Sequence, residues 1–543
     1  MAANTPASFD YVIVGAGSSG CVLASRLTED PSVRVLLLEA GGWATGLFKD
    51  MPVAFPKYVQ RKDLNWNFMS EPEPGLNGRS LPVPRGKAMG GSSTINGMVY
   101  ARGHRRDYDD WARMGLKGWG YADVLPYFKR SEKSWLGEGK YHGGSGELEV
   151  CISGPELMYE ELKASVQAAG YPVTPDYHAE ESEGLHFNEM TIAGGRRAGT
   201  ARVFLKPVMG RRNLVVDPRA HATRILIENG RATGVDYLQD GQARTAMAAR
   251  EVILAGGVYG SPQLLMLSGI GPAEHLRAVG IEPKLDLPGV GQNLIEHPLV
   301  FVGWPVKPRA ATSHLRFDRA VLQVLQWALM GKGLFATNAC AGHVFLRTDP
   351  DWDRPDVQLT CPAVGMSAGD VWMSFGEPNQ MLVSVVSMIR EDSRGVVSLG
   401  SPDPLAPPKI LFNLFKERSD VERMIRGIRA ARQIYTAPPL GELTLPEAMP
   451  GADAQSDEAL EGFIRATGEI TQHPVGTCRM GPDGDRMAVL DAELKVRGIG
   501  GLRVADASVM PNVPGGNTNA PAIMVGEKAA DLIRGKALAP AEL

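Results

Sequence analysis

Two short, mainly apolar runs lie near the start of the chain. Residues 9–14 and 33–39 each predict a buried strand, because apolar runs of this length suit strands that are covered on both faces. Between them, residues 21–27 have the spacing and small side chains of a helix, and Pro31 ends the helical region. The pattern predicts a strand–helix–strand unit in a parallel sheet.

The same patterns predict further elements downstream. Residues 251–257 resemble a buried strand that enters a glycine turn, residues 502–506 another strand, and residues 522–532 a helix. Residues 320–330 form an amphipathic helix, which we expect to pack on the core; the alternatives are a channel wall and a contact with a membrane surface. No apolar run approaches the length of about 18 residues that a spanning helix needs, so we expect no transmembrane segment.

A glycine turn separates the first strand from the first helix. Gly15, Gly17 and Gly20 have the spacing of a dinucleotide-binding turn. The first glycine permits the tight turn, the second lets the backbone approach a pyrophosphate, and the third lets the helix pack closely on the strand. With Ser18 and Ser19 at the helix start, free N–H groups and the helix dipole favour a phosphate charge.

The second strand ends at Glu39, at the distance from the turn where a carboxylate can accept hydrogen bonds from ribose hydroxyls. We therefore expect Glu39 and its neighbour Ala40 to contact a nucleotide. Both strands and the acid make the turn a strong indication of a dinucleotide site, although a glycine-rich turn without a ligand is the alternative. The turn alone does not distinguish FAD from NAD.

Composition excludes several classes of function. The 543 residues carry a net charge of −4, which lacks the basic footprint of a nucleic-acid-binding protein. The five cysteines are far apart and form no C-x-x-C pair, so we expect neither a metal site nor a disulfide framework. The first ten residues lack the basic and apolar regions of a signal peptide. These features predict a cytoplasmic protein, or one peripheral to the inner face of a membrane.

Four further segments resemble the glucose–methanol–choline (GMC) oxidoreductase family, in the family's order and across nearly the whole chain: residues 86–96, 257–271, 473–481 and 504–521. Val258 stands where a smaller residue is typical, so we expect slight local repacking. Residues 64–68 and 76–79 make the chain most similar to the bacterial choline, alkanol and sorbose dehydrogenases.

The resemblance implies an α/β protein in two discontinuous parts. A Rossmann-like FAD-binding domain with a parallel sheet would comprise residues 1–155, 190–310 and 465–543. A substrate domain with an antiparallel sheet and helices over the flavin would comprise residues 156–189 and 311–464.

The resemblance also implies FAD as the cofactor. The glycine turn at Gly90 and Gly91 would bring backbone N–H groups against the flavin or its pyrophosphate, and Asp506 would accept from flavin or ribose groups or cap a turn. Some relatives attach FAD through a histidine in this loop; Ile95 occupies that place here, so we expect noncovalent FAD. The predicted FAD contacts are Gly15, Gly17, Ser18, Ser19, Gly20, Glu39, Ala40, Trp66, Met89, Gly90, Gly91, Ser92, Asn96, Gly97, Met98, Val99, Ala222, Asp506, Ala507, Asn517 and Thr518.

The implied chemistry is oxidation of an alcohol, for which a base of near-neutral pKa must take the hydroxyl proton. His473 matches the family's base, and Asn517 matches a second position that carries His or Asn. Since Asn cannot act as a base, we expect Asn517 to stabilise the oxygen. The alternative for His473 is a buried, hydrogen-bonded histidine. We expect structural roles for His297 and Cys478, while Trp66 is either a flavin contact or a core residue.

We expect oxidation of a primary alcohol to the aldehyde, with electrons passed to a quinone or another carrier. The nearest alternative is an oxidase that reduces O₂ to hydrogen peroxide; a lyase, a light-driven decarboxylase and a non-enzymatic flavoprotein are weaker ones. Residues 300–465 carry no readable substrate code. Choline would need a carboxylate or an aromatic cage, for which Phe335, Trp352, Trp372 and Phe375 are candidates by type alone. We expect an uncharged alcohol.

Overall fold

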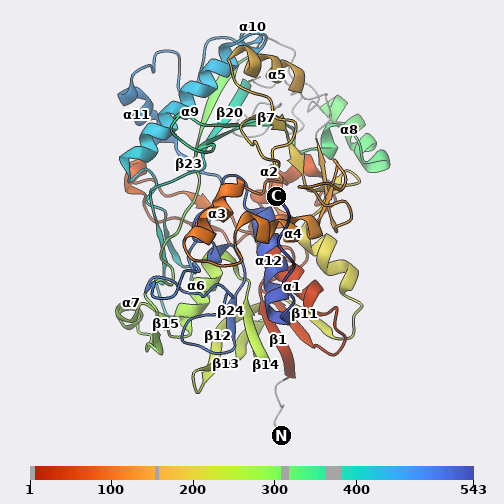
Figure 1. Cartoon of the computed structure of the whole chain (residues 1–543), viewed down its shortest axis with the longest axis vertical. Coiled ribbons are helices and arrows are strands. Elements are labelled where there is room, and N and C mark those ends of the chain that lie inside the picture. Colours follow the sequence, from red (N-terminus) through yellow and green to blue (C-terminus); the bar gives the residue numbers. More distant parts are fainter. Residues whose placement is uncertain (1–6, 153–157, 307–316, 363–380) are drawn as a thin grey trace.

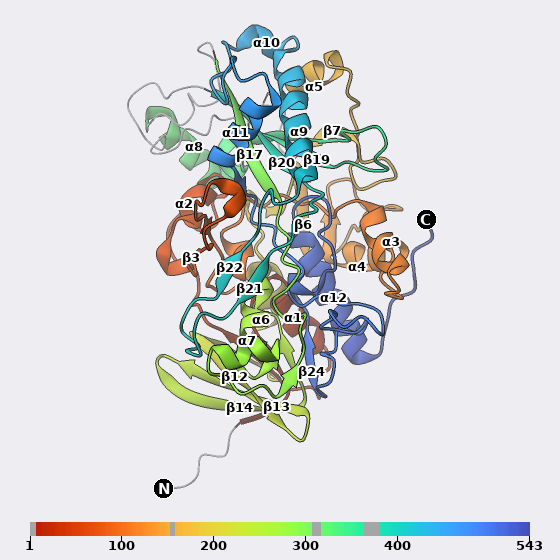
Figure 2. The same ribbon diagram turned by 90° about the vertical axis from the view of Figure 1, so that its left-hand side faces the viewer.

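The computed structural model describes residues 7–152, 158–306, 317–362 and 381–543. Two sheets lie at opposite ends of an elongated molecule (Figure 1). The view from the side separates them again, with the first sheet below and the second above (Figure 2). The mixed α/β architecture with one mainly parallel and one antiparallel sheet agrees with the fold class that the sequence predicts.

The first sheet contains the predicted strand–helix–strand unit. β1 (Ala7–Val14), α1 (Ser18–Leu27) and β2 (Val35–Glu39) follow one another, and the two strands pair in parallel. Helix α1 begins three residues earlier than predicted, because Gly17 is its N-cap. The remaining strands of this sheet are β11 (Leu214–Pro218), β12 (Ala220–Glu228), β13 (Arg231–Gln239), β14 (Gln242–Leu254) and β24 (Leu502–Val504).

The second sheet is antiparallel and lies under helix α9 (Arg418–Thr436). In order across the sheet, its strands are β23 (Glu469–Ile470), β17 (Pro298–Pro305), β20 (Met381–Met388), β19 (Val357–Pro362), β18 (Cys340–Leu346) and β7 (Gly184–Phe187). The predicted division gives β17 and β23 to the FAD domain, but their hydrogen bonds join them to the second sheet. We therefore propose that the change of domain lies before Pro298 and after Ile470.

Shorter elements connect and cover the two sheets. The other helices are α2 (Phe55–Val59), α3 (Arg105–Arg113), α4 (Tyr121–Ser131), α5 (Tyr159–Ala168), α6 (Gly257–Leu267), α7 (Ala273–Ala278), α8 (Phe317–Met330), α10 (Leu440–Leu443), α11 (Asp457–Thr467) and α12 (Asn519–Arg534). The predicted C-terminal helix is thus confirmed as α12. None of the helices in the described ranges is long and apolar enough to span a bilayer.

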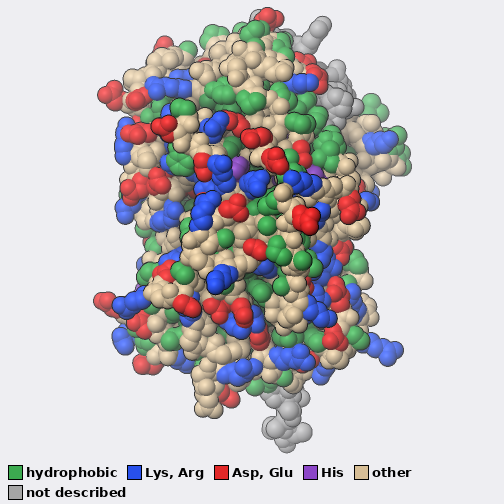
Figure 3. Space-filling model, viewed as in Figure 1, with side chains coloured by type: hydrophobic (Ala, Val, Ile, Leu, Met, Phe, Trp, Pro, Cys, Tyr) green, Lys and Arg blue, Asp and Glu red, His purple; other side chains and the backbone are tan. Residues whose placement is uncertain are grey.

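Helix α8 only partly follows its prediction. Trp327 is buried and donates through Nε1 to the Gly195 carbonyl 2.7 Å away, as expected for a helix packed on the core. The other side is also apolar, and Leu322 and Leu329 are 66% and 83% exposed. Hydrophobic side chains accordingly appear at the edge of the molecule where this helix lies (Figures 1 and 3).

The first and last helices pack against each other, although about 500 residues separate them in the sequence. A Cβ on Gly526 of α12 would lie 2.9 Å from the Ser19 carbonyl oxygen, so the glycine permits this close contact. The Ser19 hydroxyl donates to the Ala522 carbonyl oxygen at 2.7 Å. Helix α12 therefore holds the start of α1, where the glycine turn ends.

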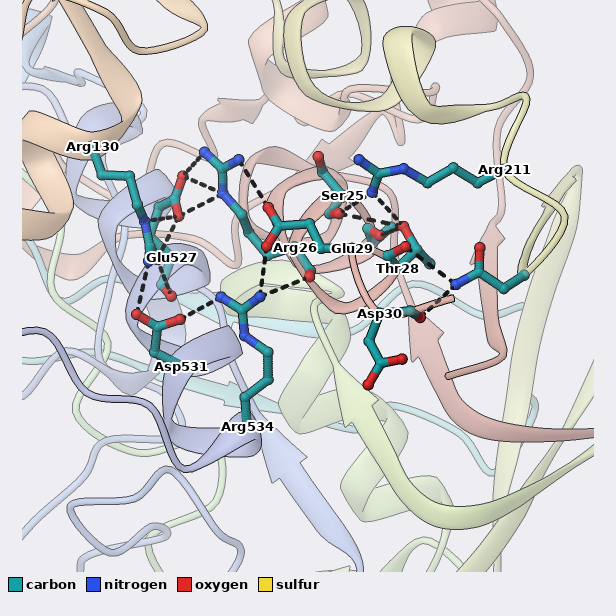
Figure 4. A network of polar contacts seen from close by, with 12 residues as sticks. Ser25, Arg26, Thr28, Glu29, Asp30, Arg130, Arg211, Glu527, Asp531 and Arg534 are labelled. Carbon is teal, nitrogen blue, oxygen red and sulfur yellow. Dashed lines mark hydrogen bonds and ion pairs between the residues drawn. The ribbon is translucent and has the colours of Figure 1, made fainter. Parts of the chain in front are cut away.

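A buried network of ion pairs strengthens this contact (Figure 4). Glu527 of α12 is fully buried and lies 2.8 Å from the guanidinium of Arg26 and 2.6 Å from that of Arg130 on α4. Asp531 pairs with Arg130 at 2.7 Å and with Arg534 at 2.5 Å. Because each buried charge has a partner, the loss of one member would leave a neighbour uncompensated, at a typical cost of about 3–5 kcal/mol.

Candidate active site

A cavity of about 1040 Å³ lies between the two sheets and receives residues from both. The predicted cofactor residues that line it are Gly15, Gly17, Ser18, Ser19, Glu39, Ala40, Trp66, Gly91, Ser92, Asn96, Gly97, Met98, Val99, Ala222, Asp506, Ala507, Asn517 and Thr518. His473 lines the same cavity. The structure thus brings the nucleotide turn and the predicted catalytic pair together in one space.

The first glycine turn is shaped for a ligand to approach its backbone. Gly15 has a φ of +105°, and a Cβ there would lie 2.4 Å from the Ala255 carbonyl oxygen, so the protein itself requires this glycine. At Gly17 the nearest protein atom to a Cβ would be 3.9 Å away, so the protein imposes no such requirement. A bare backbone there is what close approach by a pyrophosphate needs, and the cradle therefore fits a dinucleotide.

The two glycine turns touch each other. A Cβ on Gly91, which has a φ of +51°, would lie 2.7 Å from Gly17 Cα. Gly90 donates its N–H to the Ala16 carbonyl oxygen at 2.8 Å. The turn at residues 90–91 therefore closes one side of the cradle that the N-terminal turn forms.

Three predicted FAD contacts do not line the cavity. Gly20 lies inside α1, where a Cβ would meet the Gly15 carbonyl oxygen at 1.9 Å. Met89 is buried in the core, and Gly90 is held behind the lining by its bond to Ala16. Gly20 and Gly90 instead hold the two turns against their neighbours, and direct contact of these three residues with FAD stays a prediction.

Two acidic side chains hold the loops around the nucleotide end. Glu39 accepts from the Ala16 N–H at 2.9 Å and the Gly41 N–H at 2.8 Å. Burial raises the pKa of its carboxyl to about 7, against the lowering effect of these donors. A carboxylate has room for more than two donors, so Glu39 keeps acceptor capacity toward a ribose.

Asp506 shows the capping role among those predicted for it. Its Oδ2 accepts from the Gly257 N–H at 2.9 Å and from the Ser261 hydroxyl at 2.6 Å. Its Oδ1 accepts from the Ser508 N–H at 2.8 Å. Burial raises the pKa of this carboxyl. The side chain therefore fixes the start of α6 and the following turn at the cavity wall.

Four further side chains singled out in the sequence lie at the cavity wall or in the core beside it. Trp66 belongs to both predicted environments: it lines the cavity and stacks on Phe68 with ring centroids 5.6 Å apart. Ile95 presents an apolar side chain where some relatives have a linking histidine. Val258 and Cys478 are buried, and burial raises the pKa of the Cys478 thiol well above its ordinary value, as suits a core residue.

The predicted catalytic pair is in direct contact. His473 Nε2 lies 2.9 Å from Asn517 Nδ2, and both side chains face the cavity. Protein surrounds the imidazole on most sides. This burial is the main cause that lowers the pKa of His473 well below its ordinary value, and the nearby charges of His297 and Arg85 lower it further. A neutral imidazole with an unprotonated nitrogen is the form that can accept a proton.

Two adjacent residues hold the members of this pair. Glu296 accepts from the backbone N–H of His473 at 2.7 Å. His297 Nε2 lies 3.2 Å from the carbonyl oxygen of Gly516, the residue before Asn517. Since the other ring nitrogen of His297 bonds to Glu391, its contacts agree with the structural role predicted for it.

The opposite wall comes from alternate positions of the second sheet. Leu299 and Phe301 of β17 line the cavity, as do Gln358 and Thr360 of β19. Intervening residues such as Val300 are buried in the core on the other face. These wall residues were not predicted, and neither were Thr471 and Glu296. For Gln358 and Thr360, the alternation of apolar and polar residues along 357–362 was the pattern that could have indicated a strand with one face toward a cavity.

The aromatic candidates that the structure describes do not form a cage for a cationic substrate. Among the described residues that line the cavity, the acidic ones are Glu39 and Asp506, both bound to backbone N–H groups at the nucleotide end. Phe335 is buried in the core, and Trp352 lies under the Arg423 guanidinium; neither lines the cavity. The other two aromatic candidates, Trp372 and Phe375, lie outside the described residues.

Known proteins resemble the chain over nearly its full length. The GMC oxidoreductase model matches residues 9–299 with its N-terminal part and residues 391–526 with its C-terminal part. An oxygen-dependent choline dehydrogenase of Rhizobium etli is 43% identical over 97% of this chain and 96% of its own.

Solved structures agree with these sequence matches. Pyridoxine 4-oxidase from Mesorbium loti has a TM-score of 0.85 at 28% identity, over 97% of this chain and 99% of its own. Formate oxidase of Aspergillus oryzae has a TM-score of 0.91 at 28% identity, over 98% and 99%.

Proposed function

Since the chain belongs to the GMC oxidoreductase family and is an FAD-dependent alcohol oxidoreductase, we propose that it oxidises an uncharged primary alcohol to the aldehyde. His473 is the base in this proposal, and Asn517 holds the substrate oxygen. The observation that carries it is the 2.9 Å contact between His473 Nε2 and Asn517 Nδ2 at the cavity wall.

The pair presents complementary atoms to an alcohol. The unprotonated Nε2 of His473 accepts the hydroxyl proton, and the amide N–H of Asn517 donates to the oxygen as negative charge develops on it. The loss of such a donor typically costs about 2.7–4 kcal/mol of transition-state stabilisation. FAD, when bound, supplies the acceptor for the hydride that leaves the alcohol carbon. The residues of the glycine cradle, with Glu39 and Asp506, would hold it.

The charge of the cavity supports an uncharged substrate. The acidic side chains of the described lining are committed to loops at the nucleotide end, whereas Lys57 and Arg85 also line the cavity. A quaternary ammonium group would meet the cationic side chains of Lys57 and Arg85, which would repel it, although aromatic rings that could attract it, such as those of Trp66 and Phe301, line the same cavity. Choline is the second candidate, because the relatives at 43% identity carry its name.

An anaerobic screen of alcohols tests the proposed reaction and its substrate class. The probes are 1-butanol, benzyl alcohol, 1,4-butanediol and choline, each mixed with the FAD-loaded protein while the visible flavin absorbance is followed. We expect the uncharged primary alcohols to bleach the flavin and choline to do so poorly. Preferential bleaching by choline would favour the second candidate, and no bleaching by any alcohol would contradict the reaction.

We propose a quinone or another carrier as the electron acceptor, with O₂ as the alternative that the oxygen-dependent and oxidase relatives favour. Hydrogen peroxide yield and quinone-dye reduction, measured with the same alcohol, separate the two. We also propose that FAD is noncovalent, because Ile95 offers no nucleophile. Acid precipitation should release the yellow cofactor, and retention in the pellet would contradict this.

We propose a cytoplasmic location with peripheral contact to the inner face of a membrane. Support comes from the exposed apolar side of α8, which includes Leu322 and Leu329. Co-sedimentation with phosphatidylglycerol-containing vesicles is expected to weaken in Leu329→Glu but not in Leu405→Glu, which alters a leucine that is 61% exposed elsewhere. Equal effects of the two substitutions, or no binding by the wild type, would contradict the membrane contact.

A further inference from the structure

A buried carboxylate and a threonine hydroxyl stand behind the imidazole of His473. Thr471 Oγ1 lies 2.8 Å from His473 Nδ1, the nitrogen that faces away from Asn517. The same hydroxyl donates to Glu296 Oε1 at 3.2 Å. Glu296 Oε1 also accepts from the His473 backbone N–H at 2.7 Å. One carboxylate oxygen thus binds both the backbone and the side-chain partner of the base.

The direction of these bonds determines where the imidazole proton lies. Thr471 has one hydroxyl proton, and we assign it to Glu296 Oε1, because a carboxylate oxygen can only accept and is a stronger acceptor than a neutral imidazole. The remaining contact of the hydroxyl, with His473 Nδ1, is a hydrogen bond only if Nδ1 carries the proton. Nε2 is then unprotonated and accepts from Asn517 Nδ2.

The opposite arrangement breaks this chain of bonds. If Nε2 carried the proton, Asn517 would have to turn its Oδ1 toward it, which would give a partner to an oxygen that now has none. Nδ1 would then be an acceptor that competes with Glu296 Oε1 for the single hydroxyl proton of Thr471. To make a hydrogen bond there, the hydroxyl would have to turn its proton to Nδ1 and give up its bond to the carboxylate, which is the stronger acceptor.

We propose that Thr471 and Glu296 are positioning residues that hold His473 in the tautomer with the proton on Nδ1. Nε2 is thereby kept unprotonated, so that an alcohol hydroxyl that displaces the Asn517 amide from it can give up its proton there. The effect of this tautomer on alcohol oxidation rests on the proposed function, whereas the tautomer itself follows from the hydrogen bonds of the protein alone. The role belongs to the pair, because Glu296 directs the hydroxyl and the hydroxyl directs the ring.

Other charged groups around the unit do not compete for the same atoms. Arg85 donates through Nη2 to the Gln472 carbonyl oxygen at 2.6 Å, and His297 is paired with Glu391. Burial raises the pKa of the Glu296 carboxyl to about 7. Because Oε1 accepts two hydrogen bonds, a proton on this carboxyl would occupy Oε2, and Oε1 would direct Thr471 in either state.

A pair of substitutions at Thr471 tests the proposal. Thr471→Val keeps the shape of the side chain but removes the hydroxyl, and Thr471→Ser restores it. In stopped-flow reduction with 1-butanol and benzyl alcohol, we expect the valine variant to lose about tenfold or more in the limiting rate constant, part of the usual contribution of a general base. Half-saturation and FAD content should change little, and the serine variant should recover most of the rate.

Histidine ¹⁵N NMR of the FAD-loaded protein gives a direct measure of the tautomer. The His473 signal, identified by its absence in His473→Asn, should show a protonated Nδ1 in the wild type and in Thr471→Ser. In Thr471→Val it should shift toward the Nε2-protonated form. An unchanged signal in the valine variant, or equal rate losses in the valine and serine variants, would overturn the proposal.

Different results would contradict the proposed reaction and the proposed role of Thr471. If no alcohol reduces the wild-type flavin, the proposed function fails while the NMR spectrum still reports the tautomer. If alcohols reduce the flavin but the tautomer does not depend on Thr471, only the positioning role is lost.

Discussion

The two ends of the cavity recognise their ligands by different parts of the chain. At the nucleotide end the wall includes bare backbone at Gly17 and Gly91, with the carboxylates of Glu39 and Asp506 beside it. At the substrate end the wall consists of side chains such as Gln358 and Phe301, placed by the alternation of strands in the second sheet. Recognition by backbone requires glycines at fixed spacings, whereas recognition by side chains leaves no fixed local pattern.

The largest expected effect separates chemistry from cofactor binding. His473→Ala should slow flavin reduction by at least about 10²-fold, the low end for loss of a general base, while FAD stays bound. Stopped-flow reduction and the ratio of flavin to protein absorbance measure the two properties. His275→Ala, which changes a histidine outside the cavity, serves as the control. Near-normal reduction in the His473 variant would remove this residue from the chemistry.

A methyl group at Gly17 tests the backbone end of the comparison. The protein has room for a Cβ there, since the nearest atom is 3.9 Å away, so we expect Gly17→Ala to fold normally. The methyl would intrude on the cofactor at a typical cost of about 1–3 kcal/mol, which is roughly 5- to 150-fold in FAD affinity.

Titration of the apoprotein with FAD measures this change. Gly210→Ala is the matched control, because a Cβ there meets nothing within 4 Å and the residue does not line the cavity. Unchanged FAD affinity in the Gly17 variant would show that the cofactor does not approach this backbone.

A smaller effect is expected at the side-chain end. Gln358 donates to His343 at 3.1 Å, and its carbonyl oxygen accepts no hydrogen bond from the described residues. Gln358→Leu should therefore lower kcat/KM for 1,4-butanediol relative to 1-butanol by about 2- to 10-fold, the worth of one hydrogen bond. Gln263→Leu, at the nucleotide end, should leave this ratio unchanged. Equal changes in both variants would contradict a substrate-facing role for the β19 wall.

The smallest expected effect is a lack of response to pH. The pKa of His473 lies well below 6.5, so the base is already unprotonated at neutral pH. The rate of flavin reduction should hold from about pH 8 to about pH 6.5, where a histidine of ordinary pKa would already be half protonated. Protonation should reduce the rate only at lower pH. Stopped-flow reduction across this range checks the prediction, which a half-maximal rate near pH 6.5 would contradict.

The comparison explains how much the sequence could predict. The β1–α1–β2 unit and its glycine turn were readable because apolar runs and backbone requirements act locally. The contact between His473 and Asn517 came only from the family resemblance, since no spacing rule joins residues on different loops. Thr471 and Glu296 were missed because their roles arise from tertiary contacts. The assignment of β17 to the second sheet was missed for the same reason, because the apolar sequence of a strand does not indicate which sheet it joins.

The packing of α12 against α1 has a consequence for the order in which the chain can fold during its synthesis. Helix α1 emerges from the ribosome early, but the Ser19–Ala522 contact and the Arg26–Glu527 pair need residues that emerge roughly 500 positions later. Contacts so distant in sequence form slowly, because a long loop must close before they are made. Until the end of the chain has been synthesised, the N-terminal turn therefore lacks the contacts that α12 makes with its helix. The complete surroundings of the N-terminal turn therefore form only in chains that carry α12.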